Sequence, residues 1–115
     1  MTHRIAIVGG GSVGISFLYQ LLQLLQKREH RSPLAVTIFD PSDRTGSGQP
    51  YQAGDKTSLL NTRTGTTSAL SNDRGHFHAW VMRHRSAMEN IYEHLDVSPD
   101  GFLPRSVFGL YLESL

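Results

Sequence analysis

An apolar segment that runs directly into three glycines constrains the fold of this chain more than any other feature. Residues 4–8 read Arg-Ile-Ala-Ile-Val, a composition typical of a buried strand, and Gly9-Gly-Gly-Ser-Val-Gly14 follows at once. A second apolar run, residues 34–39, ends at Asp40. Because the stretch between them has helical periodicity, the order strand, glycine turn, helix, strand predicts a parallel βαβ unit.

Each glycine of this G-x-G-x-x-G pattern has a mechanical task. Gly9 permits the tight turn, Gly11 lets a pyrophosphate approach the backbone amides, and Gly14 lets the helix pack closely on the strand. The phosphates would lie beside Ser12 at the helix N-terminus, where unpaired N–H groups and the helix dipole favour negative charge. Asp40 would accept hydrogen bonds from an adenosine ribose diol. The pattern therefore predicts a dinucleotide site.

One departure from the usual spacing keeps an alternative open. The acidic residue of such a site is expected roughly 20 residues beyond the glycines, whereas Asp40 follows Gly14 by 26 positions. The additional residues fall in the helix and its exit, which favours a longer crossover. A glycine turn that has a structural role and holds no ligand remains the alternative.

The composition excludes several classes of protein. At 115 residues the chain forms one domain at most, and its net charge of +1 is spread without a basic face or tail. We therefore expect neither nucleic-acid nor membrane-surface binding. The absence of cysteine excludes disulfides, cysteine-zinc sites and a dithiol redox centre. Glycines and glutamines interrupt the first apolar stretches, so neither a signal peptide nor a spanning helix fits, and a cytoplasmic location is expected.

The rest of the chain has a coarse helical organisation. The first helix is expected from Ser12 to His30, ended by Ser32-Pro33. Residues 41–71 predict a long loop that wraps a ligand, because loops of this length inside compact domains are usually functional. One helix is expected over residues 74–95 with Asn72 or Asp73 as its N-cap, and another from Pro104 onward. The predicted fold is α/β: a Rossmann-like βαβ dinucleotide-binding unit, incomplete, with a long loop and two further helices.

The first helix has more apolar surface than two strands can cover. Only one narrow polar stripe runs along it, so most of its circumference requires contact with other residues. An uncovered apolar face costs several kcal/mol at ~25 cal/mol per Å². We therefore expect residues 1–115 to be the N-terminal portion of a larger protein, in which a missing C-terminal region or another chain covers this helix.

Several spaced blocks of sequence add a family resemblance. Ile5-Ala-Ile-Val-Gly-Gly-Gly-Ser-Val-Gly14, Phe39-Asp40-Pro41, Gly46-Ser-Gly48 before Tyr51, Leu59-Leu-Asn61, Ser68-Ala69, His76-Phe77 and Leu103-Pro-Arg105 with Gly109-Leu-Tyr111 run through the chain. Together they resemble the FAD-NAD(P)-binding family of bacterial flavoproteins, which is related to N-hydroxylating and Baeyer–Villiger type flavin monooxygenases. The resemblance covers essentially the whole chain. It implies a Rossmann-like FAD domain with NAD(P)H as the reductant.

The resemblance also implies roles for particular residues. Gly9, Gly11 and Gly14 would hold the FAD pyrophosphate and Asp40 the adenosine ribose. Arg44, Gly46 and Gly48 match a second glycine-bearing segment near the adenosine and ribityl parts, Asn61 belongs to a block beside the flavin, and Arg105 matches an arginine that faces the cofactor. Residues 1–115 contain no second glycine fingerprint, so NAD(P)H binding is not supported by a motif of its own. No catalytic residue is assigned.

Other interpretations of the same residues stay open. Arg105 is equally well explained as an exposed arginine in the first turn of a helix, and Phe77 and Trp80 are better explained by core packing than by stacking on a flavin. His76 and His78 cannot share a helix face, so no metal site is expected. The expected function is the FAD-binding part of a flavin-dependent oxidoreductase, provided the full-length protein is intact, acting on a small-molecule substrate. The alternatives are an NAD(P)-binding dehydrogenase domain or a non-catalytic remnant that binds a nucleotide or a partner.

Overall fold

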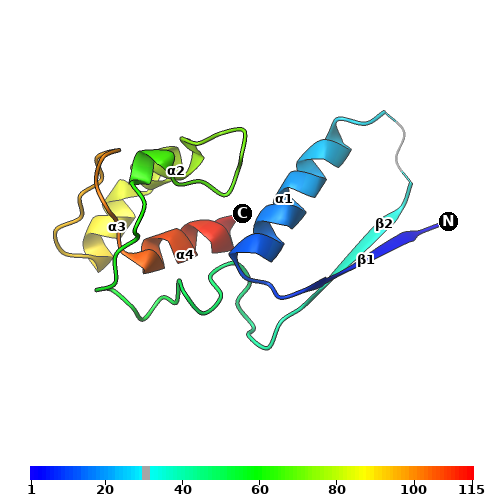
Figure 1. Ribbon diagram of the computed structural model, residues 1–115, viewed down its shortest axis with the longest axis horizontal. Helices are drawn as coiled ribbons and strands as arrows, with labels where there is room; N and C mark the ends of the chain where they lie inside the picture. Colours follow the sequence, from blue (N-terminus) through cyan, green and yellow to red (C-terminus); the bar gives the residue numbers. More distant parts are fainter. Residues whose placement is uncertain (30–31) are drawn as a thin grey trace.

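The predicted βαβ unit is present. A computed structural model describes residues 1–29 and 32–115, and it places β1 (His3–Val8), α1 (Ser12–Gln26) and β2 (Leu34–Phe39) at the N-terminal end. The two strands form a parallel sheet in which His3 pairs with Leu34 and Val8 with Phe39. The chain is thus a mixed α/β protein with a two-stranded parallel sheet and a helical crossover (Figure 1).

Helix α1 is shorter than the spacing of its polar residues predicts. It ends at Gln26, and Lys27 closes it with amide hydrogen bonds to the carbonyls of Leu24 and Leu25. The predicted end at His30 is therefore wrong, and His30 itself lies outside the residues that the structure describes. Ser32-Pro33 thus follows the helix at a distance and does not end it.

The remaining elements lie beyond the sheet. They are the 3₁₀ turn η1 (Thr64–Thr66), α2 (His76–Arg83), α3 (Arg85–Ile91) and α4 (Arg105–Ser114). Residues 41–63 contain no helix or strand, apart from an isolated bridge in which Leu59 pairs antiparallel with Pro104. The predicted long loop and the helix after Pro104 are confirmed.

The single helix expected over residues 74–95 is wrong. It is divided at His84, whose imidazole Nδ1 lies 2.8 Å from the Trp80 carbonyl oxygen and whose amide closes α2. Neither predicted N-cap residue caps α2 with its side chain: Gly75 is the N-cap, and Asp73 contributes only its backbone carbonyl to the His76 amide. Because the break takes a single residue, the apolar periodicity of the sequence continues across it.

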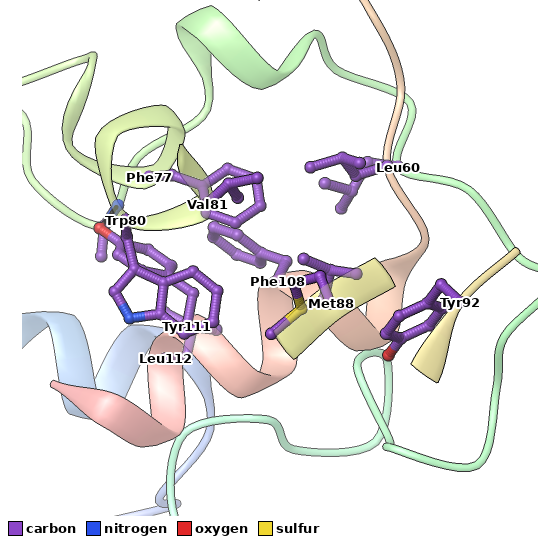
Figure 2. Packing of buried hydrophobic residues seen from close by; sticks show 12 residues of the cluster. Leu60, Phe77, Trp80, Val81, Met88, Tyr92, Phe108, Tyr111 and Leu112 are labelled. Atoms are coloured by element: carbon purple, nitrogen blue, oxygen red, sulfur yellow. Dashed lines mark hydrogen bonds between the residues drawn. The ribbon is translucent and has the colours of Figure 1, made fainter. Parts of the chain in front are cut away.

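The hydrophobic core belongs to the helical part of the molecule (Figure 2). Phe77 and Val81 of α2 are fully buried, and they pack against α4. Edge-to-face ring contacts join Phe77 to Phe108 at 5.1 Å and Tyr51 to Phe108 at 5.0 Å. The full cluster is Leu60, Ala69, Phe77, Trp80, Val81, Met88, Tyr92, Leu103, Val107, Phe108, Tyr111 and Leu112. Core packing is therefore the role of Phe77 and Trp80.

The βαβ unit contributes little to this core. Helix α1 lies between the strands and the helical part, and the molecule is elongated, with a longest dimension of 52 Å (Figure 1). Among residues 3–29 and 32–39 of this unit, the apolar side chains that are buried are those of Ile7 and Ile15. The side chains of Val13 on α1 and Val8 on β1 are more than four-fifths exposed. The expectation that α1 has more apolar surface than the strands cover agrees with this exposure.

Candidate functional site

The glycine turn has the geometry that its sequence predicts. Gly9 has a φ of 97°, a left-handed conformation that favours glycine, and its amide donates to the Phe39 carbonyl at 2.8 Å. A side chain at Gly14 would collide with the carbonyl oxygen of Gly9 and would lie 3.2 Å from the Ile7 side chain. Gly14 therefore permits the first turn of α1 to lie directly against the end of β1.

Four consecutive amides at this turn have no hydrogen-bond acceptor. The first helical bond of α1 runs from the Ile15 amide to the Gly11 carbonyl, and no side chain caps the helix. Within residues 1–29 and 32–115, the N–H groups of residues 11–14 consequently lack a protein acceptor. The N-terminus of a 15-residue helix concentrates partial positive charge at this position. Ser12, the first residue of the helix, lies here with Gly11.

Asp40 lies across the turn from these amides. Its carboxylate accepts hydrogen bonds from the Gly10 amide at 2.7 Å and the Ser42 amide at 2.8 Å. These two bonds, the Gly10 bond first, hold the pKa of the Asp40 carboxyl below its usual value. The carboxylate therefore stays ionised and faces the glycine turn. Each oxygen keeps a further lone pair, so the group can accept additional hydrogen bonds.

The second glycine segment is in direct contact with the first. The Gly46 amide donates to the Gly10 carbonyl at 2.5 Å, and a Cβ built on Gly48 would lie 3.3 Å from the Gly11 Cα. On its other side Gly46 packs against the backbone of Leu112 in α4, leaving no room for a side chain. The structure thus brings Gly46 and Gly48, which belong to the second glycine-bearing segment of the family resemblance, to the glycine turn.

Two hollows border the assembled turn. One of about 320 Å³ is lined by Asp40, Arg44, Ser47, Gly48, Gln49 and Gln52 together with neighbouring residues. The other, of about 750 Å³, is lined by β1, the glycine turn, Val13, Phe17 and residues 48–50. They share Gly48 and Gln49, so the glycine segments separate a polar compartment from an apolar one. Arg44 is exposed at the polar compartment.

Asn61 and Arg105 form a separate group. The Arg105 amide donates to the Ser58 carbonyl and its Nε to the Leu59 carbonyl at 3.2 Å, so the Arg105 side chain lies along the segment that leads to exposed Asn61. This group is at the start of α4, whereas Gly46 contacts Leu112 near its end. Seven residues of helix separate the two groups by about 10 Å.

Gly10 is the residue of this site to which sequence reasoning gave no role. It is buried, its amide binds Asp40, and its carbonyl accepts from Gly46, so it connects three parts of the turn. A Cβ there would lie 3.2 Å from side-chain atoms of Ile38 and Thr45. The run of three glycines was the available signal, because G-x-G-x-x-G itself leaves the second position free.

The histidines have separate partners. His76 Nδ1 lies 2.7 Å from the Tyr111 hydroxyl, whereas His78 Nε2 lies 3.1 Å from the Val97 carbonyl. Across residues 1–29 and 32–115, no three His, Asp or Glu side chains are grouped in a way that could hold a metal ion. In the same part of the chain, no helix has the length and apolar character required to cross a membrane.

Comparison with known proteins agrees with this geometry. A family model described as FAD-NAD(P)-binding matches residues 6–115. The chain is also similar to the Uncharacterized protein YdhS of Escherichia coli (strain K12), with 37% identity over 57 residues. That alignment covers 50% of this chain but only 10% of the relative. No solved structure matches the chain.

Proposed function

The chain belongs to the FAD-NAD(P)-binding family, and from this premise we propose that its glycine turn holds the diphosphate of FAD. The observation that carries the proposal is the set of four unpaired amides at residues 11–14, with an ionised carboxylate across the turn. A diphosphate has the charge and the acceptor oxygens that such a helix N-terminus favours. Gly9, Gly11, Ser12 and Gly14 are the proposed contacts.

Asp40 is proposed to select the sugar. Its oxygens each have capacity for a further hydrogen bond, and a ribose diol supplies two donors. The Asp40 carboxylate would repel a phosphate on the ribose 2′ position, because both groups are negatively charged. This disfavours NADP at the turn. The polar hollow beside Asp40, which Arg44 and Gly48 also line, is the proposed site of the adenosine end. Gly46 would support it by holding this segment against the glycine turn through its hydrogen bond to the Gly10 carbonyl.

The second group, Asn61 and Arg105, is proposed to face the flavin end of the same cofactor. Arg105 has guanidinium nitrogens beyond the Nε that binds Leu59, and a guanidinium suits a phosphate or carbonyl oxygen. The spacing of about 10 Å between the two groups along α4 suits an extended ligand rather than a compact one. A Rossmann-like arrangement of the sheet is part of this proposal.

The proposed activity is that of a flavin-dependent oxidoreductase, reduced by NAD(P)H and related in chemistry to monooxygenases. FAD would supply the redox chemistry, while the residues named here bind and orient it. The family description also names NAD(P), so a nicotinamide-binding dehydrogenase domain is the second candidate. We further propose that another polypeptide segment or chain covers the exposed apolar face of α1 near the glycine turn, which Val13 and Phe17 present to solvent.

Titration of the purified chain with FAD, followed by flavin fluorescence, tests the proposal. We expect saturable binding that Asp40→Ala weakens at least about tenfold, the loss of one hydrogen-bonded charged group. Asp43→Ala is the matched control because Asp43 is exposed in the same loop and does not line the polar hollow. Competition with NADH separates the two candidates.

Three outcomes decide between the interpretations. Binding of FAD but not NADH supports the flavoprotein proposal. Binding of NADH with no affinity for FAD replaces it with the dehydrogenase domain. Absence of binding to either nucleotide by a folded chain, or equal losses in the Asp40 and Asp43 variants, contradicts the proposed role of the turn.

A further inference from the structure

A second polar hollow lies at the opposite end of α1 from the glycine turn. It measures about 450 Å³, within the range of about 300–1,000 Å³ that small-molecule sites occupy. We call it the α1–α2 pocket, and it is lined by Tyr19, Gln20, Gln23, Leu24, Lys27, Leu70, Ser71, Asn72, Asp73 and His76. Three parts of the chain thus contribute to its lining: α1, residues 70–73 and the start of α2. Figure 1 shows where α1 and α2 lie in the molecule.

The pocket is distinct from the proposed nucleotide site. At 1.5 Å per residue of helix, Tyr19 lies about 12 Å and Lys27 about 24 Å beyond Gly11. None of its lining residues belongs to the glycine turn, the second glycine segment or the segment beside Arg105. A ligand bound here would therefore be additional to the nucleotide.

One wall of the pocket is held by a chain of hydrogen bonds. His76 Nδ1 lies 2.7 Å from the Tyr111 hydroxyl, which accepts the Ala69 amide at 3.3 Å. Burial raises the pKa of Tyr111, so the phenol keeps its proton at neutral pH. The contact with Tyr111 holds the orientation of the His76 ring. In the tautomer in which the phenol donates to Nδ1, the ring proton lies on Nε2 and gives His76 an N–H donor that Tyr111 does not use.

The rim carries one charge of each sign. Lys27 comes from the end of α1 and Asp73 from the turn before α2. Over residues 1–29 and 32–115, neither charge has an ion-pair partner. The Asp73 carbonyl accepts the His76 amide at 3.3 Å, so Asp73 lies beside His76 at this rim.

From this arrangement we infer that the α1–α2 pocket binds a small zwitterion of the α-amino acid class with an apolar side chain. Lys27 and the His76 N–H would receive the carboxylate, and Asp73 would receive the ammonium group. Leu24 and Leu70 supply apolar surface for the side chain. A ligand with only one of the two charges would leave either Lys27 or Asp73 without a partner.

Titration of the ¹⁵N-labelled full chain with L-leucine tests this inference. The measurement is the shift of the amide signals of residues 70–73 in ¹H–¹⁵N spectra. Two analogues separate the charges: 4-methylpentanoate lacks the ammonium group, and 3-methylbutylamine lacks the carboxylate. We expect L-leucine to bind saturably and each analogue to bind roughly tenfold more weakly or not at all.

Variants at the rim identify the contacts. Lys27→Gln and Asp73→Asn are both exposed substitutions, so the fold should persist, and each should weaken L-leucine binding roughly tenfold. Lys56→Gln and Asp43→Asn are the matched controls because neither residue lines the pocket. The inference is overturned if L-leucine gives no saturable shift, if either analogue binds as well as L-leucine, or if the rim and control variants behave alike.

Discussion

The close approach of Gly14 to the carbonyl of Gly9 leaves no room for a side chain at position 14. We predict that Gly14→Ala lowers the free energy of unfolding by about 1–3 kcal/mol, as insertion of a methyl group into a packed site does. Gly54→Ala is the control because its Cβ would meet no atom within 4 Å, and a change within about 0.5 kcal/mol is expected there. Urea denaturation followed by circular dichroism measures both. Equal stability of the two variants would contradict the packing argument.

Asp55 illustrates how a loop carboxylate contributes to stability. Hydrogen bonds from Ser58, then from Thr57, lower its pKa to about 2. Because this folded-state pKa lies below the unfolded value of about 3.9, the contribution is complete above about pH 4 and disappears as the pH falls toward 2. We predict that Asp55→Asn makes the loss of unfolding free energy between pH 4 and pH 2 shallower. Urea denaturation across this range is the measurement, and an unchanged slope would argue against these hydrogen bonds.

At the scale of elements, a buried polar contact joins the end of α3 to the start of α4. The Tyr92 hydroxyl lies 2.7 Å from the Ser106 hydroxyl, and Ser106 is fully buried. Tyr92→Phe or Ser106→Ala alone leaves one buried hydroxyl unpaired, so each should cost about 1–3 kcal/mol of unfolding free energy. The double variant should cost less than the sum of the two. Strict additivity in denaturation experiments would show that the hydroxyls do not interact, and Tyr19→Phe serves as the control.

The elements that were predicted well are those whose limits are marked by neighbouring residues in the sequence. β2 was predicted at its observed limits because an apolar run lies between Pro33 and Asp40. The end of α1 was missed because Lys27 and His30 continue the spacing of the polar residues along the helix, and the first helix-breaking residue after them in the sequence is Pro33. The division at His84 was missed because it arises from a side-chain contact with the Trp80 carbonyl, which periodicity cannot register.

In the candidate site, too, the features with local sequence signals were predicted, and those that depend on tertiary contacts were not. Gly9 and Gly14 have geometries that short-range motif reasoning predicts, since each is required by a turn or a close approach. The family resemblance assigned Gly11 and Gly48 to one cofactor, but their contact across 37 positions of sequence needed coordinates. The role of Gly10 needed coordinates, since its hydrogen bond to Asp40 depends on the packing of both strands.

The whole molecule combines two parts of unequal packing. The cluster of buried apolar residues lies in residues 60–112, whereas in the described part of the βαβ unit the buried apolar side chains are those of Ile7 and Ile15. The cofactor is proposed to bind to the less packed part. Since a ligand that binds only the folded form adds RT ln(1 + [L]/Kd) to its stability, FAD should stabilise this unit.

Hydrogen exchange measured by mass spectrometry tests this coupling between packing and binding. Without ligand, we predict that peptides of β1 and β2 exchange faster than those of α4, because local opening exposes few buried apolar contacts there. FAD at 100 times its Kd adds about 2.7 kcal/mol to the stability of the folded form. This corresponds to roughly hundredfold slower exchange in the βαβ unit, where we propose that FAD binds. The Asp40→Ala variant, at the same FAD concentration, should lose most of this protection. Strands that exchange as slowly as α4 in the free chain would contradict the unequal packing. Protection by FAD that is confined to α2 and α3 would instead place the nucleotide away from the glycine turn.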